Sequence, residues 1–395
     1  MSDVIYLDHN ATTPCDPRVL EIMLPYFTQH FGNPSSESHQ AGRDARKAVE
    51  KARKQVARLI GGDARGLKFT SGATEALSWV LQSLVWQGLQ EDRDELIVCA
   101  TEHKAVLATA EAMARRHGTK VVVLPVDSNG LASPEELRGL ITERTVAVAV
   151  MAANNETGVL GPVAEVAAVC RAAGVPYVCD ATQMIGKLPF NAKELAVDYV
   201  ALSSHKMYGP KGIGALWAGR AARKRKLEPL IYGGGQESGW RSGTVAVPLV
   251  VGFGAAAEFV LADMPEESDR LRELRDLMER ELLAKCSDLS VNGGGVERLP
   301  DTLSASFPGV DAVALLNACL AIAASPGSAC TSINNTPSHV LSAMSISPRK
   351  AQSAIRFSLG RTSRRSDLLD STISLGQAYR LLQSLSLPED HEIAQ

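Results

Sequence analysis

Short apolar runs alternate with helical segments over the first two-thirds of the chain. In these runs Val, Ala, Leu and Ile follow one another without the strict apolar–polar alternation of a half-exposed strand, at residues 66–72, 94–102, 120–127, 144–155, 175–183 and 197–206. Continuous runs of this kind are typical of strands that are buried on both faces. The sequence therefore predicts an α/β fold, with a mostly parallel sheet between layers of helices.

The character of the chain changes after about Met264. A charged amphipathic helix is predicted over residues 265–286, and a glycine-rich turn, a strand-like segment at 303–309 and a final strand and helix follow it. We therefore expect a large domain over residues 16–263. Residues 1–15 together with 264–395 are expected to form a smaller α+β domain.

The bulk composition excludes several classes of protein. A chain of 395 residues with 45% hydrophobic residues can build a large core, and a net charge of −3 argues against a general nucleic-acid or membrane-surface binder. The seven cysteines are odd in number and lack zinc-site spacing, so most are expected to be small buried hydrophobic residues. Reduced thiols, no signal-peptide pattern and no long apolar run predict a cytoplasmic protein without a membrane span.

Polar residues collect where the predicted strands end, which is where open α/β sheets bind their ligands. Ser71, Gly72, Ala73 and Thr74 follow one strand and open a helix. Backbone N–H groups at a helix N-terminus suit a phosphate, although an ordinary helix cap has the same sequence pattern.

Other strand ends carry chemically useful side chains. They are His103, Asn154 and Asn155, Asp180 with Gln183, and the run Ser203, Ser204, His205, Lys206. Each signal alone also fits a turn, a cap or a hydrogen-bonded core residue.

Together these residues match the needs of one cofactor, pyridoxal 5′-phosphate. It requires a lysine for a Schiff base (Lys206), a carboxylate beside its ring nitrogen (Asp180), a flat partner for its ring (His103) and a phosphate site. Ser203 and His205 are expected to reach back to the phosphate. A surface lysine in a loop is the alternative for Lys206, and the preceding apolar strand disfavours it.

The chain resembles the class V aminotransferase group of fold-type I pyridoxal-phosphate enzymes, and within it the cysteine desulfurases of the NifS/IscS type. The matching stretches occur in family order over nearly the whole sequence: YLDHNATTP, FGNPSSESHQAGR, FTSGATEA, TEHKAVL, NNETGVLGP, DATQMIGKLP, SSHKMYGPKGIGAL, GGGQESGWRSGT, GSACTS and IRFSLGR. The resemblance implies a large domain with a seven-stranded, mostly parallel sheet and a smaller α+β domain.

The resemblance also implies individual roles. Lys206 would bond the cofactor, His103 would stack on its ring and move protons, Asp180 would hold the ring nitrogen protonated, and Gln183 would bond the ring oxygen. The phosphate would be held by Ala73, Thr74, Ser203, His205 and, from the other subunit of a homodimer, Thr244. Asn155 and Arg356 would bind the substrate carboxylate, a task that suits a planar guanidinium.

Cys330 lies among Gly, Ser, Thr, Asn and Pro, which indicates a loop. An exposed thiol there suits a nucleophile that takes up sulfur, and the persulfide-forming cysteine of the resembled family matches this position. The loop is expected at about residues 325–337 and is similar to that of the group I, long-loop enzymes. In that family the cysteine can also help to ligate a transient [2Fe–2S] cluster; no other metal ligand is predicted.

These observations predict a pyridoxal-phosphate-dependent cysteine desulfurase. It would convert L-cysteine to L-alanine, leave the sulfur on Cys330 as a persulfide and pass it to an acceptor protein for iron–sulfur clusters or for thiolation of another cofactor or a nucleic acid. Direct binding of nucleic acid or membrane is not expected. The alternatives are a class V aminotransferase or selenocysteine lyase, in which Cys330 is incidental, and a sulfur-relay or scaffold protein without catalysis.

Overall fold

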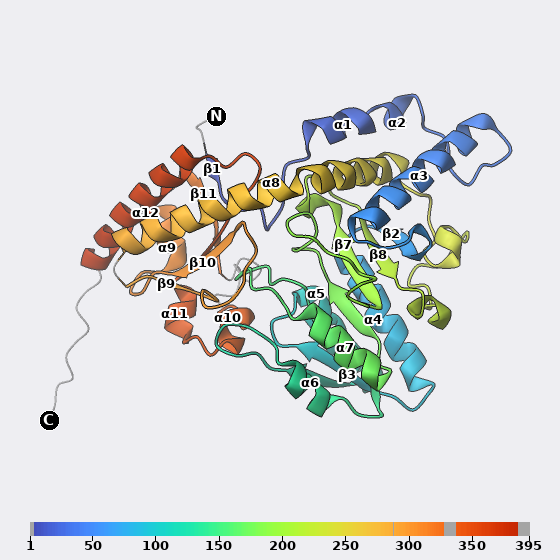
Figure 1. Cartoon of the computed structure of the whole chain (residues 1–395), viewed down its shortest axis with the longest axis horizontal. Coiled ribbons are helices and arrows are strands. Elements are labelled where there is room, and N and C mark those ends of the chain that lie inside the picture. Colours follow the sequence, from blue (N-terminus) through green and yellow to red (C-terminus); the bar gives the residue numbers. More distant parts are fainter. Residues whose placement is uncertain (1–3, 287, 328–336, 386–395) are drawn as a thin grey trace.

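The computed structural model describes residues 4–286, 288–327 and 337–385. The chain forms two lobes that lie side by side along the long axis of the molecule (Figure 1). One lobe contains a large central sheet, and the other contains a smaller sheet with the last helices of the chain.

The central sheet has seven strands, in the order β2-β8-β7-β6-β5-β3-β4. β8 is antiparallel to both of its neighbours, and the remaining pairs are parallel. Every residue of these strands is buried except in the edge strand β4, as expected for a sheet covered on both faces. The predicted α/β fold is confirmed. The strands are β2 (Leu67–Thr70), β3 (Glu95–Cys99), β4 (Lys120–Leu124), β5 (Thr145–Ala149), β6 (Tyr177–Asp180), β7 (Tyr199–Ser203) and β8 (Gly214–Ala218).

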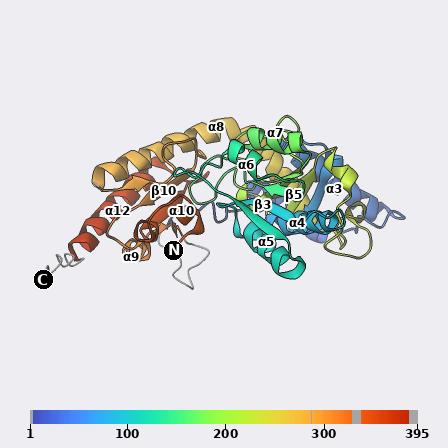
Figure 2. The same ribbon diagram turned by 90° about the horizontal axis from the view of Figure 1, so that it is seen from below.

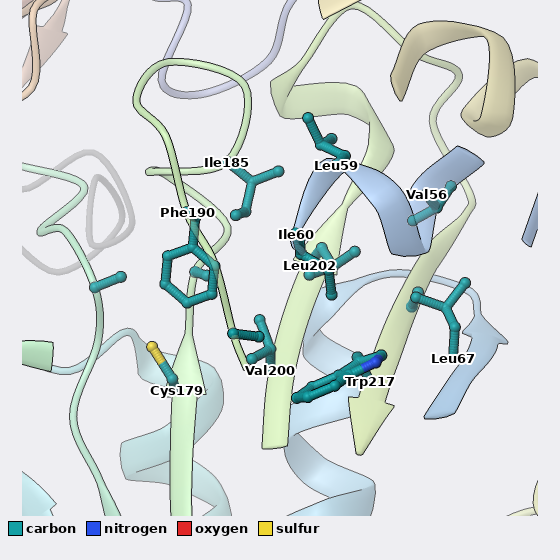
Figure 3. Packing of buried hydrophobic residues seen from close by; sticks show 14 of the residues in the cluster. Val56, Leu59, Ile60, Leu67, Cys179, Ile185, Phe190, Val200, Leu202 and Trp217 are labelled. Atoms are coloured by element: carbon teal, nitrogen blue, oxygen red, sulfur yellow. The ribbon is translucent and has the colours of Figure 1, made fainter. Parts of the chain in front are cut away.

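Helices cover the two faces of this sheet. Figure 2 shows α6 and α7 on one side of the strands and α5 on the other. α3 and α8 lie on the same side as α6 and α7, and α4 lies with α5. Figure 3 shows part of the core on the first side, where Trp217 and Leu202 of the sheet pack against Ile60 at the end of α3. The bounds are α3 (Gln40–Leu59), α4 (Ala73–Leu89), α5 (Lys104–His117), α6 (Pro134–Leu140) and α7 (Val163–Ala173).

α8 (Val247–Lys285) runs across both lobes (Figure 1). The sequence predicts a helix from residue 265, but the helix begins at Val247 and contains Pro265. Proline removes one backbone donor, yet the helix continues because it buries apolar residues of the first core before the proline and of the second core after it, such as Phe253 and Met278. α8 is long and apolar enough to span a membrane, but 61% of its most apolar window is buried inside the protein, as in the core helix of a water-soluble protein.

The second lobe has its own sheet and core. Its four strands are antiparallel, in the order β12-β13-β10-β9, and Phe307, Phe357 and Tyr379 pack edge-to-face beneath them. β1 (Ile5–Tyr6) joins this lobe by pairing with β11 (Ile322–Ala323). The other strands are β9 (Ser290–Val291), β10 (Thr302–Ser306), β12 (Ser325–Pro326) and β13 (Ala354–Ser358), and the helices are α9 (Ala312–Asn317), α10 (His339–Ala343), α11 (Pro348–Gln352) and α12 (Arg365–Leu385). The division of the chain at Met264 falls within α8 and stays a prediction.

The remaining elements are short. α1 (Pro17–Met23) and α2 (Pro25–Thr28) lie beside α8, and four 3-10 turns are η1 (Ala64–Gly66), η2 (Ser204–Lys206), η3 (Ala222–Arg225) and η4 (Glu237–Gly239). Within the described residues, all cysteines except the partly exposed Cys15 are buried, which confirms their predicted role as small core residues: Cys99, Cys170, Cys179, Cys286 and Cys319.

Candidate active site

A cavity of about 780 Å³ lies at the carboxyl ends of the parallel strands, with side chains of both lobes in its wall. Apart from Thr244, every predicted site residue within the described part of the chain lines it: Ala73, Thr74, His103, Asn155, Asp180, Gln183, Ser203, His205, Lys206 and Arg356. Strand ends that are far apart in the sequence are therefore brought together as predicted.

Lys206 ends the single turn η2 that follows β7. Its Nζ donates to the carbonyl oxygens of Asn10 at 2.5 Å and Ala11 at 2.8 Å. Burial lowers the pKa of the Lys206 amine to about 8, and the positive charges of Lys187 and Arg356 act in the same direction. A lysine with such a pKa is a better nucleophile and base near neutrality than an ordinary one.

The N-terminus of α4 borders the cavity. Its N-cap is Gly72, and no side chain in the described part of the chain caps it. A Cβ built on Gly72 would meet no atom within 4 Å, so open space faces this residue. Glu75 in the first turn is neutralised by Arg241, whose Nε lies 2.8 Å from Glu75 Oε1. An anion can therefore take up the free N–H groups of this helix end.

His103 follows β3 and Asp180 ends β6, two parallel strands that are separated in the sheet by β5. His103 caps α5 because its Nδ1 accepts the N–H of Ala105 at 3.1 Å. Burial lowers the pKa of His103, so the ring is neutral and its proton lies on Nε2. Asp180 ends β6, is 8% exposed, and accepts the N–H of Thr182 at 2.9 Å.

His205 and Ser203 flank the base of the cavity. His205 Nδ1 lies 3.1 Å from Thr12 Oγ1, and burial, with the Lys206 charge, lowers the pKa of His205 to about 4. The His205 ring is therefore neutral at ordinary pH. Ser203 is the last residue of β7 and is 6% exposed.

Arg356 brings a guanidinium from β13 of the second lobe. Its Nη2 donates to Asp8 Oδ1 at 2.6 Å and to Ser325 Oγ at 3.1 Å, and its Nη1 donates to Asn155 O at 3.0 Å. Its Nε is buried and has no hydrogen-bond partner among the described residues. These bonds use three of the five N–H donors, so the Nε–H is one of two donors that remain for a ligand carboxylate.

Asp8 and Asn10 are site residues that the sequence reasoning missed. Asn10 is 1% exposed, and its carbonyl oxygen accepts from both Lys206 Nζ and Gln183 Nε2, the latter at 3.0 Å. Its side chain accepts from Lys187 Nζ at 2.5 Å. Both residues lie in the stretch YLDHNATTP, which matches the resembled family, but neither residue type by itself indicates a role.

Two other predicted site residues remain, Thr244 and Cys330. Thr244 lines a separate cavity of about 80 Å³, which shares Ser71 and Gly212 with the main one. Cys330 lies outside the described residues.

Comparison with known proteins decides the family. The family described as "Aminotransferase class-V" matches residues 5–370. The chain belongs to this family. It is 47% identical to "Cysteine desulfurase IscS" of Anaeromyxobacter sp. (strain Fw109-5) over 90% of this chain and 88% of that protein. The resemblance to the cysteine desulfurases of the class V aminotransferases is thus confirmed.

Solved structures agree with this assignment. A "NifS-like protein" is 36% identical, with a TM-score of 0.87, and the match covers 96% of this chain and 100% of that one. A structure titled "SspA in complex with cysteine" is 34% identical, with a TM-score of 0.80, and covers 90% of this chain and 98% of that one.

The site of this class V aminotransferase fits pyridoxal 5′-phosphate, the cofactor of the family. The uncapped helix end with open space at Gly72 suits the phosphate, Asp180 suits a cationic ring nitrogen, and the Lys206 amine suits the aldehyde.

Proposed function

We propose that this protein is a pyridoxal-phosphate-dependent cysteine desulfurase, which converts L-cysteine to L-alanine and passes the sulfur through Cys330 to an acceptor protein. The proposal rests on the observation that one cavity is lined by Lys206, His103, Asp180 and Arg356. The relative named cysteine desulfurase and the neighbour solved with cysteine support the choice of substrate.

The large lobe holds the cofactor, which when bound supplies an electron sink for the amino acid attached to it. The N–H groups at Ala73 and Thr74 would bind its phosphate, and Asp180 would keep a proton on its ring nitrogen. Ser203 and His205 add donors to the phosphate, and Gln183 bonds the ring oxygen. Lys206 removes the proton from the substrate Cα, which its lowered pKa favours.

The second lobe orients the substrate. Arg356 binds the cysteine carboxylate, using the Nε donor that is unpartnered among the described residues, and Asn155 lies beside it in the cavity wall. His103, in the cavity wall, would stack on the cofactor ring and move protons. Because Nδ1 accepts from Ala105, His103 can donate only from Nε2; it becomes a base for the Cys330 thiol when it releases the Ala105 N–H.

A homodimer is part of this proposal. Large apolar side chains are exposed near α1 and α2, among them Leu24 (55%), Phe27 (55%) and Phe31 (75%). Such an exposed group is typical of a protein interface. The proposed role of Thr244 as a phosphate ligand also requires a second copy, because Thr244 does not line the main cavity of its own chain.

The sulfur acceptor is proposed by class: a scaffold protein of iron–sulfur cluster assembly or a protein of a thiolation pathway. We propose a cytoplasmic location, where free cysteine and reduced thiols are available.

The test is incubation of the purified protein with L-cysteine, followed by quantification of alanine and mass spectrometry of Cys330. We expect alanine to form without a keto acid, and Cys330 to gain one sulfur atom. C330S should lose turnover while keeping the absorbance of bound cofactor, and C15S, which changes a cysteine outside the cavity, should turn over normally. Alanine formation by C330S at the wild-type rate would contradict the proposal, and transamination that depends on a keto acid would favour an aminotransferase.

A further inference from the structure

Glu156 is a half-buried carboxyl group that the proposed chemistry does not use. It directly follows Asn155 in the loop after β5, and its Oε2 accepts the hydroxyl of Ser338 at 2.5 Å. Ser338 is 3% exposed and belongs to the other lobe. The bond therefore joins the large lobe to the start of α10.

The loop that carries Glu156 is itself held firmly. Asn154 Oδ1 accepts the N–H groups of Glu156 at 2.8 Å and Thr157 at 3.0 Å, and Asn154 Nδ2 donates to Thr101 O at 3.0 Å. Gly158 closes the turn with a φ of 78°, and a Cβ there would lie 2.8 Å from Thr302 Cβ. Glu156 is thus presented from a rigid support.

Ser338, the partner of Glu156, is also fixed in place by hydrogen bonds. Ser338 is the N-cap of α10, and its Oγ accepts the N–H of Leu341 at 3.2 Å, which leaves its own hydrogen for Glu156. The next residue, His339, places its Nε2 2.8 Å from Glu102 O. The start of α10 is therefore bonded to the two loops that carry Asn155 and His103.

The chain on the other side of residues 328–336 is also bonded to the site. Ser325 Oγ donates to Asp8 Oδ1 at 3.0 Å and accepts from Arg356 Nη2 at 3.1 Å. On one side of the segment that contains Cys330 the chain is therefore bonded to residues of the cavity wall, and on the other side to Glu156 and Glu102, which are the sequence neighbours of the cavity residues Asn155 and His103.

We propose that Glu156 is a positioning residue, which holds the start of α10 against the loop that carries Asn155 through the Ser338 hydroxyl and so sets where the Cys330 segment rejoins the fold. This inference rests on the proposed function, because it gives Glu156 its effect through the reaction of Cys330.

The charge of Glu156 adds a pH dependence. Burial raises the pKa of Glu156 to about 7, while the Ser338 hydroxyl and the positive charges of Arg356 on β13 and Lys104 on α5 act to lower it. Above this pH Glu156 is a carboxylate and the Ser338 bond is charge-assisted; below it the bond joins two neutral groups and weakens. The positioning effect should therefore fade as the pH falls through about 7.

The kinetic test compares E156Q and S338A with the wild type, using alanine formation from cysteine. We expect kcat to fall about tenfold in each, the factor of one charge-assisted hydrogen bond, with the KM for cysteine and the cofactor absorbance unchanged. The double variant should be no slower than either single one. S338T, which keeps the hydroxyl, should retain kcat. S347A should also retain it, because Ser347 caps the neighbouring helix α11 without a bond to the cavity.

Two further measurements separate positioning from general damage. The ratio of wild-type to E156Q kcat cancels the titration of Cys330. With a pKa of about 7 for Glu156, this ratio should fall from about ten well above pH 7 to about two at pH 6 and approach one at about pH 5. Backbone hydrogen exchange in residues 339–343 should be faster in E156Q than in the wild type, both with and without cofactor. The Ser338 cap is retained in E156Q, so loss of the cap would not be the cause. A wild type that makes no alanine would refute the proposed function. If the wild type makes alanine, three results would refute the role of Glu156 alone. They are variants with the same kcat as the wild type, additive losses of kcat in the double variant, or an unchanged rate of hydrogen exchange in E156Q.

Discussion

The Lys206 amine offers the sharpest quantitative prediction. It is half-buried in the wall of the cavity, and removal from water, followed by the charges of Lys187 and Arg356, lowers its pKa from 10.5 to about 8. The shift corresponds to a penalty of about 3 kcal/mol on the charged amine. At about pH 7.5 roughly a quarter of such amines are neutral, against about one in a thousand for an ordinary lysine, a difference of about 200-fold.

The assay is competitive labelling of the cofactor-free protein with acetic anhydride over a series of pH values. Only the neutral amine reacts, and mass spectrometry reports the extent of labelling at Lys206 relative to the exposed Lys51. The expected midpoint for Lys206 is near pH 8. The midpoint of this pH profile does not depend on how accessible the Lys206 amine is, because accessibility changes only the maximum extent of labelling.

Lys187 provides an internal check on the cause of the shift. Its Nζ lies 2.7 Å from Asp301 Oδ2, and its charge lowers the pKa of Lys206. K187M removes that positive charge and leaves Asp301 unpaired, and both changes should move the Lys206 midpoint upward. A wild-type midpoint at the ordinary lysine value of about 10.4 would refute the reasoning, and so would a downward move in K187M.

Two further predictions concern ion pairs. Arg53 and Glu237 form a buried bidentate pair, with N–O distances of 2.6 and 2.7 Å, so R53M should lower the free energy of unfolding by about 3–5 kcal/mol. Urea unfolding checks this, and R53M/E237Q should lose less because no carboxylate is left unpaired. R356K should raise the KM for cysteine about tenfold or more at unchanged cofactor absorbance, because an ammonium cannot replace the planar fork; an unchanged KM would show that another group binds the carboxylate.

Much of the fold could be predicted because its signals are local. Apolar runs identified the strands of the central sheet, and the rule that parallel strands share their carboxyl edge brought Asp180, His103 and Lys206 to one place. The start of α8 was missed because a proline ordinarily marks a helix boundary. Burial on both sides of Pro265 outweighs its lost hydrogen bond, and that burial is a tertiary property.

The parts of the site that escaped prediction depend on contacts between distant segments. Asp8 meets Arg356 across 348 positions of sequence, and Ser338 meets Glu156 across 182. Neither pair has a spacing that marks it as a pair. Asn10 acts largely through its backbone carbonyl, which its residue type does not reveal.

The passage of α8 through both lobes also limits how the molecule can move. A connection by loops would let one lobe swing on the other, whereas a single uninterrupted rod shared by two cores resists bending. We therefore expect the two lobes to keep nearly the same relative placement during turnover. For the same reason, severing the polypeptide near Met264 should yield two fragments that each expose half of a helix and do not fold alone.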